Sequence, residues 1–510
     1  MGQHESAGRH QEGGRTHMTK RILIVGKSGL LGTKLHERLV NKYRVGGVSK
    51  SGAGMNNREL DITEQDAVET FFDTYSFDVV IHVAANTDVD FCEHNQTEAW
   101  ETNVEGTKNL VLECKKRGIK FCYLSSDYIF SGANPPYEAD ANPDPVNYYG
   151  MTKLEGERII REELHDFVII RPGKLYGYTP DFGCDPFTSW VRNSLSEDST
   201  VRVDDSIVKY PTLIDDVSRF VEAAIESDWT GLFNFSGPDS TTKYEWARSI
   251  AANYGFDSSR VEAKTADPYA DRPQDVRYVS TDFGIDPHGV ETGIEVMYKQ
   301  EYCSFRPIYR MDIAEEFQGQ SSGEIRKRLG AVLAREDDIE PDVVVPIPKS
   351  GIYPAIGYAE EIGSPLEFAL SKQQLRKRTL YDESIDRINV LEEKMRAIKS
   401  LIENKTVAVV DEAVLSGKTL RTVIPILGAA SKIHVRISSP PVTQTCPAYM
   451  HPENSNIFVD DLDIDSESND IESAIAAELN VSSVKYVDRD SYLLEMGVEG
   501  DDICSFCFHS

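Results

Sequence analysis

Short apolar runs alternate with longer amphipathic stretches along the first third of the chain. In a segment such as "EAWETNVEGTKNLVLECKK", apolar residues recur with the period of a helix. The runs between such segments are short and rich in β-branched residues, and they lie at 21–25, 79–85, 120–126 and 167–172. Strands that alternate with helices in this way are typical of βαβ units, which build a parallel sheet. The pattern therefore predicts an α/β domain with a doubly wound parallel sheet.

A second α/β series follows a stretch of loops. Residues 173–290 are less regular and predict a lobe that covers a substrate, and the Gly- and Asp-rich segment 282–293 predicts a domain boundary. The pattern beyond it predicts strands at 342–348, 366–370, 406–411 and 433–437, helices at 351–363, 386–402 and 418–428, and a basic loop at 371–379. We expect a domain at 18–290 and a second α/β domain at 291–510.

Composition and charge narrow the class of protein. The chain has 510 residues, enough for two to four domains, and 40% hydrophobic and 27% charged residues, as in globular proteins. Its formal net charge of −30 argues against non-specific binding to nucleic acids, and no apolar run has the length of a membrane span. Eight cysteines without a secreted disulfide framework predict a cytoplasmic protein, and we expect small-molecule substrates and a homo-oligomer. The polar residues 1–17 predict a disordered tail, with Met18 as the effective start.

A glycine-rich turn follows the first strand and opens a helix. Glycines at this junction let the backbone turn tightly and approach a pyrophosphate, which then lies at the helix N-terminus. The residues predicted to bind a dinucleotide there are Gly26, Ser28, Gly29, Leu30 and Gly32. The second strand ends in Ser49 and Lys50, where an acid would hold a ribose hydroxyl of NAD(H). A hydroxyl and a cation favour the 2′-phosphate of NADP(H), and the alternative is that Lys50 is a solvated loop residue.

A phenol and an ammonium lie four residues apart at Tyr149 and Lys153, on one face of a predicted helix. A nearby cation favours the phenolate and would lower the pKa of Tyr149 toward a range useful for acid–base catalysis. Ser126, at the end of a predicted strand, offers a hydroxyl to a substrate oxygen. Such a Tyr–Lys pair alone is more often a surface pair, but the glycine turn and the serine favour a catalytic role.

Six motifs in order resemble the extended short-chain dehydrogenase/reductases, most closely the dTDP-4-dehydrorhamnose reductases. They are "LDITEQDAV", "DVVIHVAANTDVDFCE", "TNVEGTKNL", "SSDYIFSG", "YYGMTKLEGE" and "RPQDVRY". The resemblance covers residues 20–285 and implies hydride transfer from NAD(P)H to a 4-keto sugar nucleotide. It implies a catalytic trio of Ser126, Tyr149 and Lys153, and cofactor contacts by Asp61, Ile62, Ala84, Ala85 and Asn103. Some proteins with this fold are regulatory, so the alternatives are a non-catalytic sensing module, or a chain in which only the second domain is catalytic.

A second nucleotide signature follows the apolar run at 407–410. Two carboxylates, Asp411 and Glu412, come directly after the run, where they can accept hydrogen bonds from both hydroxyls of a ribose. Small residues then lead to a loop whose amides suit a 5′-phosphate and which consists of Ser416, Gly417, Lys418 and Thr419. It is not a Walker loop, because the leading glycine is absent and acids precede it.

This stretch is similar to the PRPP-binding motif of type I phosphoribosyltransferases. Further motifs resemble the C-terminal half of the amidophosphoribosyltransferases: "DVVVPIPKSGIYPAIGYA", "SKQQLRKRTL", "DRINVLEEKM", "HVRISSPPVTQTCPAY" and "CSFCF". The resemblance implies that Mg²⁺ and PRPP bind together, with PRPP held by the loop of Lys349, Ser350 and Gly351 and by the two acids. It implies that Lys372 and Arg378, in a basic loop, stabilise the leaving pyrophosphate. The glutaminase domain of that family begins with a cysteine, whereas the first cysteine here is Cys92. We therefore expect no glutaminase domain, and the phosphoribosyl acceptor stays open.

Four cysteines fall in the last part of the chain. Cys446, Cys504 and Cys507 match positions that hold a [4Fe–4S] cluster in some amidophosphoribosyltransferases, and Cys303 is the candidate for a fourth ligand. Four thiolates suit an iron–sulfur cluster or zinc equally well. The alternative is that they are buried thiols without a metal.

Overall fold

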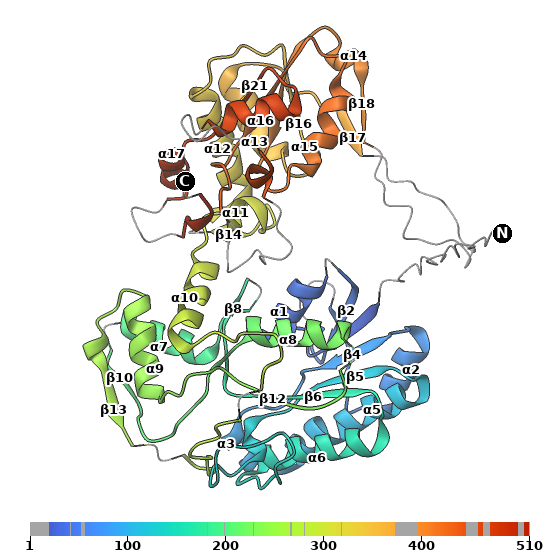
Figure 1. Ribbon diagram of the computed structural model, residues 1–510, viewed down its shortest axis with the longest axis vertical. Coiled ribbons are helices and arrows are strands. Elements are labelled where there is room, and N and C mark those ends of the chain that lie inside the picture. Colours follow the sequence, from blue (N-terminus) through green and yellow to red (C-terminus); the bar gives the residue numbers. More distant parts are fainter. Residues whose placement is uncertain are drawn as a thin grey trace, which may run out of the picture. The chain divides into compact units, whose positions relative to one another are not determined.

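The computed structural model describes residues 20–40, 42–52, 57–180, 182–197, 199–227, 229–265, 268–279, 281–317, 319–372, 395–444, 457–462, 470–497 and 504–508. The predicted tail, residues 1–17, lies outside the described residues. The chain forms two compact units, residues 1–298 and 299–510, and helix α10 (Val290–Glu301) contains the division between them (Figure 1).

A seven-stranded parallel sheet forms the centre of the first unit. Its order is β12-β6-β5-β4-β1-β2-β3, and all neighbouring strands run parallel. The strands are β1 (Arg21–Val25), β2 (Arg44–Ser49), β3 (Asn57–Glu59), β4 (Val79–His82), β5 (Lys120–Leu124), β6 (Phe167–Pro172) and β12 (Gly231–Phe235). The chain reverses its direction of winding between β1 and β4, which opens a crevice at their carboxyl ends.

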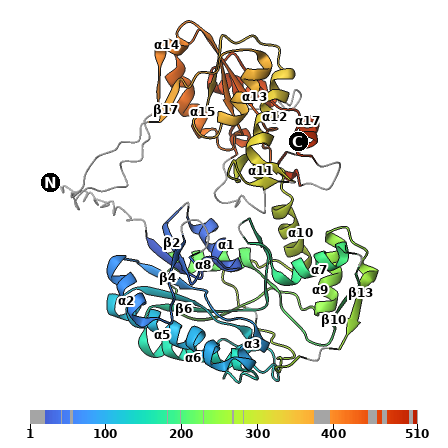
Figure 2. The same ribbon diagram turned by 180° about the vertical axis from the view of Figure 1, so that it is seen from behind.

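Helices cover both faces of this sheet (Figure 1, Figure 2). Because side chains alternate along a strand, Ile22 and Ile24 of β1 pack with α1 (Leu30–Leu39) and α8 (Ile214–Glu226). Leu23 and Val25 belong to the opposite core, with α2, α5 and α6. Those helices span Gln65–Thr74, Gly106–Arg117 and Tyr148–Glu163. The predicted doubly wound α/β fold of the Rossmann type is confirmed.

Shorter elements complete the first unit. Those near the sheet are α3 (Val89–His94), α4 (Gln96–Trp100), the π-helix η1 (Glu101–Glu105) and the 3₁₀ turn η2 (Asp127–Ile129). The less regular lobe contains β7 (Leu175–Tyr176), β8 (Tyr178–Thr179), β9 (Gly183–Cys184), α7 (Pro186–Ser196), β10 (Val201–Asp204), β11 (Thr212–Leu213), α9 (Lys243–Asn253), η3 (Ser258–Arg260) and β13 (Val261–Lys264).

The second unit contains a four-stranded parallel sheet of order β16-β19-β20-β21. Its strands are β16 (Val343–Pro346), β19 (Thr406–Asp411), β20 (Lys432–Ile437) and β21 (Ser483–Tyr486). One face packs with α12 (Ser322–Arg335) and α13 (Ile352–Ile362), the other with α15 (Lys418–Val423) and α16 (Ile471–Leu479). The remaining elements are α11 (Arg306–Tyr309), β14 (Glu316–Phe317), β15 (Gln320–Ser321), β17 (Leu370–Lys372), β18 (Met395–Ala397), α14 (Lys399–Ile402), η5 (Ile424–Leu427), η7 (Phe458–Asp461), α17 (Arg489–Glu495) and η9 (Phe506–Phe508).

The structure corrects three boundaries predicted for the second unit. Residues 395–397 of the predicted helix 386–402 form β18, because they pair antiparallel with β17, and tertiary pairing outweighs helix propensity. The strand expected at 366–370 occurs as β17, at Leu370–Lys372. The helix expected at 418–428 changes to a 3₁₀ turn after Val423, since Pro425 cannot donate a backbone hydrogen bond. No helix in the described ranges is long and apolar enough to cross a membrane.

Candidate active sites

The glycine turn at the end of β1 has a geometry that side chains would prevent. Gly26 has φ +93°, and a Cβ there would lie 2.7 Å from the backbone nitrogen of Ala84. A Cβ on Gly32 would lie 2.1 Å from the carbonyl oxygen of Gly26. Gly29 precedes α1 and no side chain of the described residues caps that helix, so its first amides can bind an anion. Leu30 begins α1 and Ser28 is exposed beside it, so the five predicted residues form one turn.

The residues predicted farther along the crevice also lie at the carboxyl ends of their strands. Ser49 ends β2, and the backbone N–H of Ala84, two residues after β4, donates to Val25 with Ala85 next to it. The Lys50 Nζ lies 2.9 Å from Asp61 Oδ2, and the Lys50 side chain is 79% exposed. The cation expected near a 2′-phosphate is therefore paired with a second predicted cofactor residue. Ile62 is buried, and a Cβ on Gly106 would lie 2.7 Å from its side chain.

Ser126, Tyr149 and Lys153 lie together at the carboxyl end of β5. Asn147 caps α6 by accepting a hydrogen bond from the backbone of Gly150 at 2.9 Å, which fixes Tyr149 in the first turn. Lys153 follows one turn later on the same face. All three side chains are buried, and Ser126 and Tyr149 are hydrogen-bonded. Burial raises the pKa of Tyr149, and the hydrogen bond with Ser126 opposes only part of that rise.

The expected lowering of the Tyr149 pKa is therefore wrong for the protein without ligands. The physical reason is that the cation is desolvated as well. Burial lowers the pKa of Lys153 to about 7, although the carboxylate of Glu157 favours the ammonium. The Lys153 Nζ lies 4.1 Å from the centre of the Tyr123 ring, so part of its surroundings is aromatic. Lys153 is thus poised between its two protonation states near neutral pH.

Asn103 lies in the π-helix η1 and is 1% exposed. Its Nδ2 donates to the carbonyl oxygen of Asn86 at 3.1 Å and to Thr152 Oγ1 at 3.0 Å. Its Oδ1 accepts from the backbone N–H of Asn86 at 2.8 Å. Both amide hydrogens are used. Asn103 therefore ties the loop after β4 to the helix that carries Tyr149 and Lys153.

A buried ion pair behind Lys153 was not singled out from the sequence. Arg171 donates from Nε and Nη2 to the two carboxylate oxygens of Glu157, at 2.9 and 2.6 Å, and both side chains are 1% exposed. Ser125 donates to the same carboxylate. Glu157 follows Lys153 by one helical turn, and this spacing was the signal that could have identified it.

Replacing Glu157 with glutamine should destabilise the first unit by about 3–5 kcal/mol, because it leaves the Arg171 guanidinium buried without a countercharge. We expect the midpoint of thermal unfolding to fall by roughly 10 °C. Glu155→Gln is the matched control, since it breaks an exposed pair with Arg158 on the same helix. Equal melting temperatures for the two variants would contradict a structural role for the buried pair.

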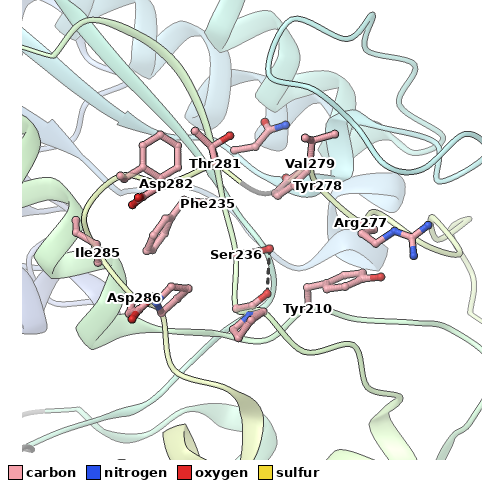
Figure 3. Close-up of a pocket in the computed structure, with 15 residues that line it drawn as sticks. Tyr210, Phe235, Ser236, Arg277, Tyr278, Val279, Thr281, Asp282, Ile285 and Asp286 are labelled. Atoms are coloured by element: carbon pink, nitrogen blue, oxygen red, sulfur yellow. Dashed lines mark hydrogen bonds between the residues drawn. The ribbon is translucent and has the colours of Figure 1, made fainter.

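A cavity of about 540 Å³ lies at the carboxyl end of β12 and contains none of the residues predicted from the sequence. Asp282, Ile285 and Asp286 lie on one side of it and Tyr210 and Arg277 on the other (Figure 3). Part of its wall, residues 277–278, ends the motif "RPQDVRY", and the rest comes from segments in which no site was predicted.

In the second unit, β19 delivers the predicted acids to the carboxyl edge of its sheet. Ser350 donates to Asp411 Oδ1 at 2.6 Å, which joins the loop after β16 to the end of β19. Burial raises the pKa of Asp411 to about 6, against the hydrogen bond from Ser350. Burial also raises the pKa of Glu412 to about 8, although Arg326 lies 3.2 Å from its carboxylate. Arg326 was not predicted, because 86 positions of sequence separate it from Glu412 (412 − 326).

Three backbone features shape the loops around these acids. Lys349 is exposed and has φ +81°, a strained conformation for a residue with a side chain. A Cβ on Gly351 would lie 2.1 Å from the carbonyl oxygen of Val410, so this loop packs directly on β19. Gly417 has φ +68° and packs under the Phe458 ring. Ser416 is half-buried, and Lys418 and Thr419 are exposed at the start of α15.

Two predicted residues, Arg378 and Cys446, lie outside the described residues, whereas Lys372 ends β17. Cys303 and Cys504 form a backbone bridge, and the Ser304 N–H donates to the carbonyl oxygen of Cys504 at 3.0 Å. The Thr443 N–H donates to the carbonyl oxygen of Cys507 at 2.9 Å. Among the residues that the structure describes, no group of three or more His, Cys, Asp or Glu side chains could hold a metal ion. The four-cysteine site stays a prediction.

Comparisons with known proteins match each half separately. Residues 20–301 match the RmlD substrate binding domain, and residues 318–437 match the phosphoribosyl transferase domain. The β subunit of methionine adenosyltransferase 2 from Xenopus tropicalis is 30% identical over 261 residues, 50% of this chain and 78% of that protein. A probable low-salt glycan biosynthesis reductase of Haloferax volcanii is 30% identical over 207 residues, 40% of this chain and 69% of that protein.

Among solved structures, dTDP-4-dehydrorhamnose reductase from Bacillus anthracis in complex with NADP superposes with a TM-score of 0.50. It is 25% identical and covers 55% of this chain and 99% of its own. These matches agree with the α/β folds of the two units. With more than half of its 510 residues matched, the chain belongs to the RmlD substrate-binding domain family, and it carries a phosphoribosyl transferase domain at 318–437.

Proposed function

We propose that the chain is a bifunctional enzyme. Its first unit reduces the keto group of a sugar nucleotide with NAD(P)H, and its second unit transfers phosphoribose from PRPP. The observation that carries the reductase is the meeting of Ser126, Tyr149 and Lys153 in a buried cluster, in a fold whose crevice begins at an uncapped glycine turn. The NADP bound by the Bacillus anthracis relative supports the choice of a nicotinamide cofactor.

Each residue of the trio has a distinct role in this proposal. A bound NAD(P)H supplies the hydride. Tyr149 donates its phenolic proton to the carbonyl oxygen, and Ser126 donates a hydrogen bond to the same oxygen. The ammonium of Lys153 stabilises the phenolate that the proton transfer leaves behind. Burial of the three groups strengthens these interactions by excluding water.

The direct test is NADPH oxidation by the purified chain with a panel of nucleotide 4-keto sugars. We expect loss of NADPH absorbance with at least one member of the panel, and a weaker rate with NADH if Lys50 leaves Asp61 for a 2′-phosphate. Binding of NADPH without oxidation by any member would contradict the reductase and favour a sensor.

The pH dependence of the reaction follows from the pKa of Lys153, which is lowered to about 7. Below this pH the ammonium is present and can stabilise the Tyr149 phenolate, and above it the proton is lost. Because kcat/KM reports the ionisation of the free enzyme, it should fall as pH rises through about 7. Steady-state assays at several pH values in buffers of constant ionic strength measure this. A profile that is flat or rises with pH across this range would contradict the role of the cation.

A regulatory module is the second candidate for the first unit. The relatives named as β subunits of methionine adenosyltransferase 2 favour it, because they are subunits of another enzyme. The buried trio favours catalysis over this alternative, since a sensor does not need a desolvated tyrosine beside a poised lysine. NADPH turnover separates the two.

In the second unit, Asp411 and Glu412 accept hydrogen bonds from the ribose hydroxyls of PRPP. The loop of Ser416 and Gly417 binds the 5′-phosphate, and the loop of Lys349, Ser350 and Gly351 binds the pyrophosphate with Mg²⁺. The phosphoribosyl transferase match supports this assignment, as does the 2.6 Å contact between Ser350 and Asp411, which brings the loop of residues 349–351 beside the first of the two acids. Lys372 and Arg378 would stabilise the leaving pyrophosphate. The phosphoribosyl acceptor is not assigned. Measuring pyrophosphate release from PRPP with ammonia, amines and nucleobases in turn identifies it.

We also propose that Cys303, Cys446, Cys504 and Cys507 hold a [4Fe–4S] cluster or zinc. The backbone bridge of Cys303 with Cys504, and the contact of Thr443 with Cys507, support this proposal. We also propose that the protein is cytoplasmic and forms a homo-oligomer, as expected from the sequence.

A further inference from the structure

The ammonium of Lys153, which the proposed reaction needs, lies against an aromatic ring. The Lys153 residue is 3% exposed, and within the described residues its Nζ donates no hydrogen bond to another protein group. Its Nζ lies 4.1 Å from the centre of the Tyr123 ring. An ammonium at this distance is attracted by the negative face of the ring, and the attraction grows where water is excluded.

The acidic groups that act on Lys153 are either engaged elsewhere or neutral. Glu157, one turn further along α6, accepts hydrogen bonds from Arg171 and from the Ser125 hydroxyl. Cys92 lies on α3, and burial raises the pKa of its thiol to about 11, so the thiol is neutral near neutral pH. Glu157 is thus a countercharge that Lys153 shares with Arg171, which leaves a role for the aromatic ring in favouring the ammonium.

The neighbouring strand helps to fix the Tyr123 ring. Strand β5 pairs with β4, and the register places His82 opposite Tyr123, with ring centroids 5.6 Å apart. His82 is buried, and its Nε2 lies 3.0 Å from Thr107 Oγ1. Burial, and then the nearby charge of Lys153, lower the pKa of His82 to about 3. This imidazole is therefore neutral and packs against the tyrosine without adding a second cation.

A glycine of α6 makes room for the same ring. Gly156 follows Lys153 by three residues, and a Cβ there would lie 2.5 Å from the Tyr123 hydroxyl oxygen and 3.1 Å from Cζ of the ring. Glycine in the interior of a helix lowers its stability relative to alanine. The space that the tyrosine occupies is a physical reason for glycine at this position. Two strands and one helix therefore hold the ring beside Lys153.

We propose that Tyr123 is a positioning residue of the reductase, whose ring face holds the Lys153 ammonium one helical turn from Tyr149. This inference rests on the proposed function of the first unit. Because the ring stabilises the charged form of Lys153, its loss shifts the lysine toward the neutral amine, which cannot stabilise a phenolate. The ring thus offsets part of the effect of burial and keeps the ammonium populated up to about neutral pH.

The first test measures the protonation of Lys153 without turnover. Nuclear magnetic resonance of the full chain with isotope-labelled lysine side chains follows the titration, and Lys153→Met identifies the signal by its loss. Tyr123→Leu should lower the midpoint by about one pH unit or more, since a desolvated cation–π contact favours the ammonium by about tenfold or more. Tyr123→Phe keeps the ring face and should titrate close to wild type. Tyr75→Leu is the matched control, because it removes a ring 4.7 Å from Arg58 at the end of α2.

The second test uses the pH profile of kcat/KM. In Tyr123→Leu the fall of kcat/KM with rising pH should begin about one unit lower than in wild type, with a loss of about tenfold near neutral pH. Gly156→Ala should change the profile in the same direction, because its methyl group displaces the Tyr123 hydroxyl. Gly156→Ala combined with Tyr123→Phe should restore most of the rate, since the atom that the methyl group meets is then absent.

A Lys153 titration that is equal in wild type and Tyr123→Leu would overturn the positioning role. So would a loss of rate in Tyr123→Leu without a shift of the pH profile, which a packing defect alone would give. A Gly156→Ala defect that Tyr123→Phe does not relieve would also count against it, and Gly156→Ala carries both measurements where Tyr123→Leu does not fold. If no keto sugar is reduced but the Lys153 titration shifts as expected, the reductase proposal fails while the effect of Tyr123 on Lys153 stands.

Discussion

Replacing Tyr149 with phenylalanine should lower the rate of NADPH-dependent keto-sugar reduction by about a thousandfold, the size typical of a lost general acid. Phenylalanine fills the same buried space, so the loss is that of the phenolic proton and of the hydrogen bond with Ser126. We expect kcat and kcat/KM to fall together, because the proton moves only in the transition state. Stopped-flow measurement of NADPH oxidation at saturating substrate gives the rate directly.

The control for this variant is the neighbouring tyrosine. Tyr148 is half-buried at the start of the same helix and is not a member of the trio. Tyr148→Phe should keep nearly full activity, and both variants should keep the wild-type NADPH affinity and melting temperature. A Tyr149→Phe protein that still turns over within a few-fold of wild type would mean that another group donates the proton.

In the second unit, Asp411→Asn combined with Glu412→Gln should reduce pyrophosphate release from PRPP by about a thousandfold in kcat/KM. Each carboxylate is expected to accept a charged hydrogen bond from a ribose hydroxyl, worth about 1.5–3 kcal/mol. The amides keep the shape of the side chains but cannot ionise. Release of radiolabelled pyrophosphate in the presence of Mg²⁺ and ammonia measures the effect.

Two further variants separate chemistry from stability in this experiment. Glu412→Gln leaves the buried Arg326 without its countercharge, so the single variant Asp411→Asn, which spares that contact, is measured alongside. Glu403→Gln, at an exposed position before β19, is the matched control and should behave as wild type. Unchanged PRPP turnover in a folded Asp411→Asn protein would place the ribose elsewhere.

Local patterns predicted the elements that place the two sites. The strand β19 is buried on both faces, and its continuous apolar run was enough to predict strand 406–411 with Asp411 at its end. The spacing of Tyr149 and Lys153 places both side chains on one face once a helix is predicted there. The glycine turn was predicted because it directly follows a predicted strand. These features depend on residues within one or two turns of each other.

Features that depend on tertiary contacts could not be predicted in this way. The raised pKa of Tyr149 follows from burial by distant segments, whereas its sequence neighbours indicated the opposite direction. The pairing of β18 with β17 overrides a helical pattern. Lys209, whose Nζ donates to the Tyr128 hydroxyl, lies 81 positions away from it in the sequence, and no spacing rule connects the two residues. The residues that loops of the lobe contribute to this site therefore could not be predicted from the sequence.

The three bonds of Arg326 decide where this chain can be cut into separately expressed pieces. Its Nε and Nη2 donate to the carbonyl oxygens of Pro307 and Met311, at 3.0 and 2.7 Å, while Nη1 reaches Glu412. A fragment that starts after Met311 would leave the buried Arg326 guanidinium without these two acceptors and weaken its contact with Glu412. A start before Cys303 keeps both carbonyls and the bridge to Cys504. The first residues after α10 thus help to position the acids of the second unit, and a truncated protein has to include them.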